Sequence, residues 1–294
     1  MVPAAAAAGA AAALYYLGRL GAGCAMATAR SELEWLEGVR AGRGGAQQEA
    51  VLLARVVAAM DAHKGDAAVQ AAACQALLRS AASAEALIKA GAHLRVLRTM
   101  RFRGGALLHG TALEVLAAIA SSGNNHVLLV RLGAGARCVE AMTSFVGDAL
   151  VAAACCAALE QLARTGATAK QLALVGSHTA VLKAMASHQN DERLQTMACS
   201  AFWALSSSCS AYAALLVQSK AHEAIIKAMA RHPGSGLLQE HAAGALANMA
   251  VFANCEVLLR AGAQEHLLVA LRHHPDDPAV VRFATIALQN LHQA

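Results

Sequence analysis

The amino-acid sequence predicts an all-α protein built as a solenoid, a stack of short helical repeats that share one continuous core. Alanine, the best helix former, makes up roughly a quarter of the residues. Only 3% of the residues are aromatic and only 4 are proline, so the residues that favour strands are scarce. With 57% hydrophobic and 15% charged residues, the chain has too much apolar surface to remain disordered.

A pattern that recurs every 40 to 44 residues favours a repeat array over two globular domains. Each unit has an apolar helix end, a polar loop, a capping residue and a further apolar helix. The helix ends that mark the repeat are Met60, Met100, Met142, Met185, Met229 and Leu271. The pattern therefore predicts about six helical units over residues 31–294.

Helix start and stop signals fall at the same place in most units. The residues six positions after each mark are Asp66, Ala106, Asp148, Asp191, Ser235 and Asp277. All but Ala106 are types whose side-chain oxygen caps a free amide of the first helical turn. Further along, Gln70, Gln195 and Gln239 align ten positions after their marks. Glycines within KAGA (89–92), RLGA (131–134) and RAGA (260–263) predict the ends of the preceding helices.

These units resemble armadillo repeats, which contain a short first helix, a second helix and a longer third helix. The segments that carry the resemblance are ALIKAGAHLRVLRTM at 86–100 and LQEHAAGALANMA at 238–250. The chain is similar to a small, degenerate member of that family, and HEAT repeats are the nearest alternative architecture. The resemblance implies a right-handed superhelix whose third helices line a concave binding groove.

The first 30 residues are rich in alanine and glycine, and three interpretations of them remain open. The segment AALYYLGRLGAGC at 12–24 aligns with 244–255 if one residue slips, which favours a partial repeat or N-terminal cap. Arg19, with no acidic residue before Glu32, also fits a cleaved organellar targeting peptide. A secretory signal or membrane span fits less well, because no basic start precedes the apolar run. We expect a cytoplasmic protein without a membrane span, with the mitochondrion as the alternative compartment.

Cysteine and histidine are frequent, but their placement follows the repeat and does not indicate a metal site. Cys74, Cys156 and Cys199 share one repeat position, which predicts a small buried slot where cysteine packs as a small hydrophobe. A row of histidines, each three positions after a mark, consists of His63, His188, His232 and His274. Such a histidine can cap the last carbonyl groups of its own helix. Equivalent residues on stacked helices lie about 10 Å apart, too far to share a zinc ion. We expect no metal, no cofactor and free thiols, as in a reducing compartment.

No motif for catalysis or nucleotide binding stands in the sequence: it has no P-loop, no GxSxG, no HExxH and no GxGxxG after a predicted strand. The net charge of +5 is modest and no long basic tract accompanies it, which argues against nucleic acid as a partner. We therefore expect a protein that is not an enzyme, has no small-molecule substrate and binds other proteins.

The resemblance also identifies candidate groove residues on the third helices. In peptide-binding armadillo proteins the third helix carries a tryptophan and, four residues later, an asparagine that bonds an extended peptide. The tryptophan positions here hold Gln75, Glu114, Ala157, Ser200, Gly244 and Ile286, and the asparagine positions hold Arg79, Ala118, Gln161, Ala204, Asn248 and Asn290. Trp203 lies three residues past its position, so the aromatic array of nuclear import adaptors is missing. What remains is a small-residue groove with amide donors at one end and an arginine at the other.

Two roles stay open for the groove amides of Asn248 and Asn290, which Gln161 could extend. Equivalent amides one repeat apart, about 10 Å, match about three residues of an extended partner strand. Alternatively, each asparagine bonds a neighbouring loop and stiffens the stack.

A basic cluster of Arg95, Arg98, Arg101 and Arg103 crowds the end of one second helix and its loop. Favourable contacts with the helix dipole are one explanation. The functional interpretation is that an acidic segment of a partner docks there, since guanidinium groups pair with carboxylates through two hydrogen bonds.

Taken together, these features favour a non-enzymatic scaffold or structural assembly subunit of a larger complex, for example axonemal or organellar. Short loops and the lack of an accessory domain indicate that the solenoid itself carries the function. The alternative is a soluble adaptor that captures peptide motifs transiently in the concave groove.

Overall fold

The computed structural model describes residues 22–38, 46–80, 82–101, 104–207, 210–251 and 253–293, and all regular structure within them is helical. The helices are α2 (Ala22–Gly38), α3 (Ala46–Ala62), α4 (Ala67–Arg79), α5 (Ala84–Lys89), α6 (Ala92–Thr99), α7 (Ala106–Ala120), α8 (Asn125–Arg131), α9 (Ala134–Ser144), α10 (Ala149–Leu162), α11 (Gly166–Leu174), α12 (Ser177–Ser187), α13 (Glu192–Ser207), α14 (Ser210–Gln218), α15 (Ala221–Arg231), α16 (Gly236–Met249), α17 (Cys255–Arg260), α18 (Ala263–His273) and α19 (Pro278–His292). None of these described helices is long and apolar enough to cross a membrane.

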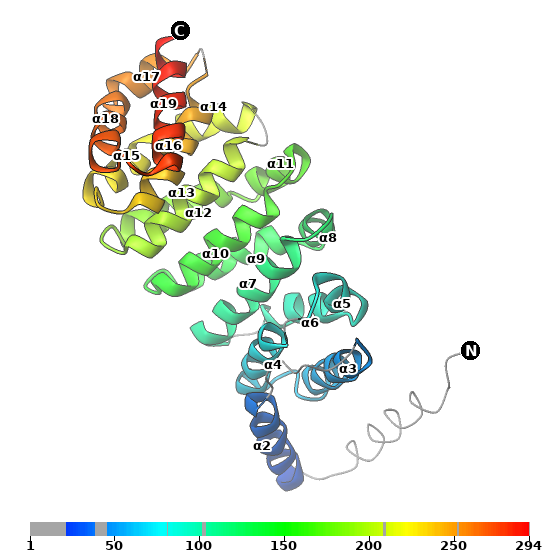
Figure 1. Cartoon of the computed structure of the whole chain (residues 1–294). Helices are drawn as coiled ribbons and strands as arrows, with labels where there is room; N and C mark the ends of the chain where they lie inside the picture. The colour runs from blue at the N-terminus through cyan, green and yellow to red at the C-terminus, as the bar shows by residue number, and fades with distance from the viewer. Residues whose placement is uncertain are drawn as a thin grey trace.

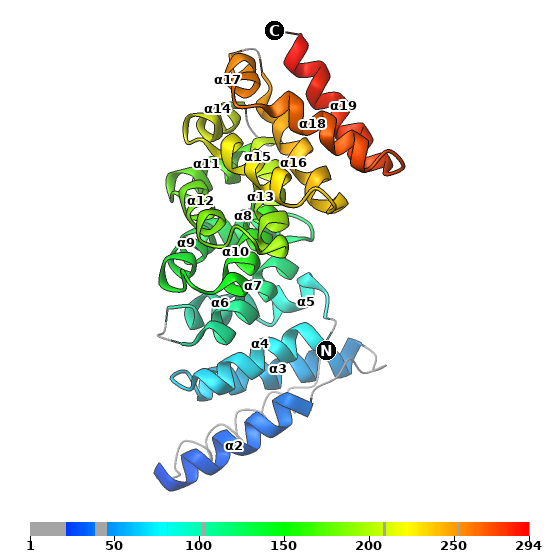
Figure 2. The ribbon, with the colours of Figure 1, turned by 90° about the vertical axis from the view of Figure 1, so that its left-hand side faces the viewer.

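The helices group into consecutive repeat units. Helices α3 and α4 form a unit of two helices, and the units that follow contain three helices each: α5–α7, α8–α10, α11–α13, α14–α16 and α17–α19. The units stack into an elongated column that rises from α2 to α19 (Figures 1 and 2). The predicted all-α solenoid is therefore confirmed, and its units have three helices where a HEAT unit has two.

The third helix of each unit packs on the third helices of its neighbours, so α4, α7, α10, α13, α16 and α19 form a continuous layer. Second helices α9, α12, α15 and α18 form a parallel row beside it. The core lies between these layers and includes the fully buried side chains of Leu113, Leu159 and Phe202. Each unit thus buries its apolar face only by stacking on the next, as repeat proteins do.

Small buried residues let the third helices approach one another. Cys74, Cys156 and Cys199 are fully buried, and Ala243 fills the equivalent place on α16, which confirms the predicted slot. Burial raises the pKa of the Cys74 and Cys199 thiols to about 12. These thiols therefore stay protonated near neutral pH and pack as small hydrophobes.

The predicted cap residues start the third helices in most units. The carboxylates that accept hydrogen bonds from first-turn amides belong to Asp66, Asp148, Asp191 and Asp277. Ser235 also occupies the cap position of α16, but its hydroxyl makes no cap hydrogen bond, so the predicted bond is wrong there. Gly105 stands at the start of α7, where the sequence offers no capping side chain.

A left-handed residue precedes the second helix in each three-helix unit. Gly91, Gly133, Gly176 and Gly262 have φ angles between 72° and 89° at this place, which confirms the three predicted helix stops at Gly91, Gly133 and Gly262 and adds a fourth at Gly176. The fifth such residue is Lys220, with φ 65°, in a conformation that a side chain disfavours.

Three buried glutamines fasten the turn between second and third helices. The Nε2 atom of Gln195 donates to the carbonyl oxygens of Met185 and His188, both at 3.0 Å. The equivalent amides of Gln70 and Gln239 donate to Met60 and His63 and to Met229 and His232. Because carbonyl groups at a helix end lack partners within the helix, these amides explain why glutamine recurs at this position.

Histidines at the ends of second helices join neighbouring units. The Nε2 atoms of His188, His232 and His274 lie 2.8, 3.2 and 2.7 Å from the carbonyl oxygens of Val146, Gln189 and Pro233. Each acceptor belongs to the loop that follows the second helix of the preceding unit. The prediction that these rings cap their own helices is therefore wrong, because each ring reaches across the unit boundary. We call this row the histidine ladder.

Helix α2 occupies the place of a third helix in front of the first unit, because it packs on α4 as the later third helices pack on one another. Leu36 is fully buried, and Nη2 of Arg79 donates to its carbonyl oxygen at 2.8 Å. The proposed division between residues 30 and 31 falls inside this helix, and most of the segment 12–24 lies outside the described residues.

We expect stability to fall as the pH drops below about 6.5, the ordinary pKa of histidine. Burial lowers the pKa of His93, His178 and His222, which share the second position of α6, α12 and α15. Their Nδ1 atoms are buried without a hydrogen-bond partner. Below the unfolded pKa, the unfolded chain binds protons that the folded chain does not. The contribution to stability is therefore complete above the unfolded pKa, and it is lost progressively as the pH falls from there to the lowered pKa of the folded state.

Urea unfolding on either side of pH 6.5 measures this loss. Replacing the three histidines together by glutamine should flatten the pH dependence of the free energy of unfolding. An unchanged slope in that triple variant would show that other groups cause the acid sensitivity.

Candidate functional site

The exposed side of the third-helix layer is the first candidate surface. On each third helix, the second residue and those four, seven and eleven residues later share one side, because a helix has 3.6 residues per turn. On α16 these are Leu237, His241, Gly244 and Asn248. We call the surface formed by these four positions on α4, α7, α10, α13, α16 and α19 the third-helix face; it contains all the predicted tryptophan and asparagine positions.

Large leucines stand exposed along one edge of the third-helix face. Leu107, Leu150 and Leu237, the second residues of α7, α10 and α16, are 64%, 65% and 53% exposed. The equivalent residue on α13 is Arg193. Beyond this edge the middle of the face is lined by small residues such as Ala157 and Ser200. Leu107 and Leu150 lie on adjacent third helices, and exposed apolar side chains on neighbouring helices are a feature of protein-binding surfaces.

An aromatic cluster lies toward the C-terminal end of the face. The centroid of the Trp203 ring on α13 lies 5.7 Å from that of the His241 ring on α16. It lies 4.6 Å from the centroid of the Phe283 ring on α19, which it meets edge to face. A Cβ atom added to Gly244 would lie 2.6 Å from the indole, so the missing side chain makes room for it. The repeat register predicts no groove role for Trp203, yet its partly buried ring covers the vacant tryptophan position of the next unit, at Gly244. A glycine at that position, one repeat after a displaced tryptophan, is the sequence signal that could have identified it.

The two predicted groove asparagines bond the preceding third helix. Nδ2 of Asn248 donates to the carbonyl oxygen of Trp203 at 3.4 Å and to the hydroxyl of Ser206 at 3.2 Å. Nδ2 of Asn290 donates to the carbonyl oxygen of Ala247 at 3.0 Å. In this conformation their amide nitrogens join adjacent repeats, as the stiffening alternative supposed, but the acceptors lie on the preceding third helix and not in a neighbouring loop.

The other predicted groove residues lie apart from this pair. Nε2 of Gln161 donates to Glu160 at 3.1 Å, beside an open hollow of about 430 Å³ at the ends of α7, α10 and α13. Arg164 lines the same hollow and donates to the carbonyl oxygen of Ser121, one unit back. Arg79 lies at the far end of the column, where it holds α2.

Two of the four clustered arginines have an acidic partner within the chain. The carboxylate of Asp61, at the end of α3, lies 2.8 Å from Arg95 and 2.7 Å from Arg98. Burial alone would raise the pKa of Asp61, but the hydrogen bonds and charges of both arginines hold it below its usual value. Arg101 is exposed after α6, and Arg103 lies outside the described residues. The structure therefore leaves Arg101 as the described member of the cluster that is open to an acidic partner.

The placement of the potential metal ligands and of the thiols can be read from the described part of the chain. No three histidine, cysteine or acidic side chains there are placed to hold a metal ion. The thiols of Cys138, Cys155 and Cys156 are buried with a raised pKa, which suppresses nucleophilic thiolate.

Comparisons with known proteins agree with this geometry. A family model described as LRRK2 ARM repeat matches residues 89–294. A designed armadillo repeat protein superposes with a TM-score of 0.70 at 21% identity, covering 82% of this chain and 100% of its own. An engineered protein gives a TM-score of 0.74 at 24% identity, covering 82% and 99%. A designed armadillo repeat protein in complex with the peptide (KR)4 gives 0.70 at 20% identity, covering 82% and 99%. A search of curated proteins found no match.

Proposed function

We propose, from the premise that this chain belongs to the armadillo-repeat family, that it is a non-enzymatic scaffold or assembly subunit that binds another protein along its third-helix face. The observation that carries the proposal is the joint presence on that face of exposed leucines and an aromatic cluster. Leu150, Leu237 and Trp203 offer apolar and aromatic surface of the kind that anchors protein interfaces. The buried free thiols favour a reducing compartment, so we propose the cytoplasm, the axoneme included, with the mitochondrion as the alternative.

The way adjacent repeats are joined supports a permanent interface. Asn248 and Asn290 use amide donors to hold neighbouring third helices, so the face is organised before a partner arrives. A preorganised surface loses little conformational entropy on binding, which favours stable complexes.

Transient capture of peptides is the second candidate function. One of the similar designed proteins is in complex with the basic peptide (KR)4. On this chain the third-helix face carries one acidic side chain, that of Glu114, and the net charge is +5. A peptide bound here would therefore be chosen by apolar side chains more than by basic ones. In this proposal the side-chain oxygens of Asn248, Asn290 and Gln161 would accept hydrogen bonds from its backbone, since their amide nitrogens already donate within the chain.

Placing charge on the leucine edge tests the scaffold proposal. We expect the L150E/L237E variant to fold normally, because both side chains are already exposed, and to lose a partner that copurifies with the wild-type chain at fixed stoichiometry. The matched control is Leu174→Glu, at an 87% exposed leucine at the end of α11, away from the third-helix face. Equal recovery of the partner by both variants would contradict the proposal. Recovery that is substoichiometric and abolished by salt would favour the peptide adaptor.

A further inference from the structure

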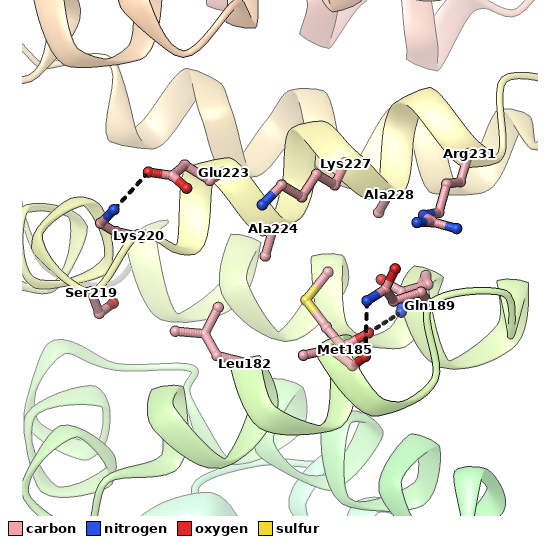
Figure 3. Close-up of a pocket in the computed structure, with 12 residues that line it drawn as sticks. Leu182, Met185, Gln189, Ser219, Lys220, Glu223, Ala224, Lys227, Ala228 and Arg231 are labelled. Atoms are coloured by element: carbon pink, nitrogen blue, oxygen red, sulfur yellow. Dashed lines mark hydrogen bonds and ion pairs between the residues drawn. The ribbon is translucent and has the colours of Figure 1, made fainter.

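The opposite, second-helix side of the column has a hollow of its own between α12 and α15 (Figure 3). Its volume is about 280 Å³. Leu182 and Met185 of α12 line one wall, and Ala224 and Ala228 of α15 line the other. Alanines on α15 leave open space where larger side chains would close the gap, so an apolar side chain from outside can enter between the two helices.

Cationic groups line the α15 side of the mouth of this hollow (Figure 3). Lys220, Lys227 and Arg231 line it from α15 and its preceding turn, and Glu223 is the acidic residue among the lining side chains. Lys220 lies 3.3 Å from Glu223, and Arg231 donates to the side-chain oxygen of Asn190 at 3.1 Å. Three positive charges against one negative charge leave the mouth cationic, and Lys227 is exposed over the opening.

Lys220 adds an independent observation. It has a left-handed backbone, φ 65°, at the place where four other units use glycine. A side chain in this region is strained, and strain of this kind is concentrated at functional sites. The lysine side chain at this position puts an ammonium group at the entrance of the hollow. Glycine here would relieve the strain but remove the charge.

We propose that this hollow binds an acidic segment of a partner protein, which inserts one apolar side chain between α12 and α15. Its carboxylates pair with Lys227, Arg231 and Lys220 at the mouth. Charge complementarity determines the class of partner, and the apolar walls require a hydrophobic residue within the acidic run. The site lies on the second helices, so it does not depend on the third-helix face.

Binding of a synthetic probe tests the proposal directly. The probe is a fluorescein-labelled peptide of aspartate and glutamate with one central leucine, followed by fluorescence anisotropy at low salt. We expect saturable binding that the K227E/R231E variant weakens by about tenfold or more. The K64E/K170E variant carries the same charge change at exposed sites elsewhere and should bind like the wild type. No binding by the wild type, or equal weakening in both variants, overturns the proposal.

Further variants separate the insertion from simple charge attraction. Replacing the probe's leucine by serine, or Ala224 by leucine to fill the hollow, should each weaken binding severalfold while the variant protein melts normally. Lys220→Gly should raise the melting temperature, by relieving the left-handed strain, and still weaken binding, a combination that a purely structural lysine would not give. Glu223→Gln should strengthen binding. If the serine probe binds as well as the leucine probe, the surface attracts charge only and the proposed site is wrong.

Discussion

Removal of residues 1–38 should lower the melting temperature sharply and promote aggregation. The truncation takes away α2, which covers the outer side of α4 as each later third helix covers its neighbour. Leu36 is fully buried there, and the Arg79 guanidinium would lose the carbonyl group that it bonds. The truncated column would end in an exposed apolar face. Repeat proteins normally cover this face with a terminal capping unit whose outer side is polar.

A point variant tests the same contact without removing a helix. Leu36→Ala should destabilise the protein by about 2–5 kcal/mol, the cost of truncating a fully buried leucine. The matched control is Glu34→Ala on the same helix, where an exposed ion pair with Arg30 contributes little. Thermal melts followed by circular dichroism and size-exclusion chromatography measure both. Equal stability of the two variants would show that α2 does not cap the column.

Replacing Gln195 by leucine should destabilise the folded chain by about 2 kcal/mol, because it removes one buried and one partly buried hydrogen bond and leaves carbonyl groups short of a partner. The new side chain is similar in size, so the loss reports on hydrogen bonding more than on packing. Met185 is almost fully buried, and water cannot easily replace the lost donor at its carbonyl group.

Gln171→Leu, at an exposed position on α11, is the control for a general effect of adding an apolar side chain. Urea denaturation gives the free energy of unfolding for both proteins. Gln239→Leu should behave like Gln195→Leu, since it makes the same two bonds in the next unit. A Gln195→Leu protein as stable as the control would mean that the amide contributes nothing net to the turn.

The fold was readable from the sequence because its signals are local. Capping aspartates such as Asp148, glycines that end helices such as Gly133 and the repeat spacing each report on a few neighbouring residues. The left-handed backbone of Lys220 could not be predicted from its own segment, which has no glycine there. Only the glycines at the equivalent position of the other units mark it as left-handed. Helix α2 was harder to place, because its role depends on packing against α4, which a single segment does not encode.

Contacts between units were predicted less well, for a physical reason. Whether His188 bonds its own helix or the loop at Val146 depends on the offset between stacked units, which sequence spacing does not give. The same offset carries the Trp203 ring onto Gly244. Pairing of Asp61 with two arginines likewise joins side chains more than thirty residues apart. The repeat register therefore predicts which positions each residue occupies, but only the structure shows which residues of the neighbouring unit they contact.

The histidine ladder and the asparagines together set the mechanical character of the column. They lie at opposite ends of the third helices, so a junction tied by both resists bending in either direction. The last two junctions are tied in this way, by His232 with Asn248 and by His274 with Asn290. Among the described side chains, the junction before the third unit has neither of these ties, and its side-chain hydrogen bonds, from Arg164 to Ser121 and from Asn125 to Ile119, both lie at the C-terminal end of α7. Under load the C-terminal part should act as a stiff beam and the middle as an elastic hinge, so a partner that spans both would sense the curvature of the column.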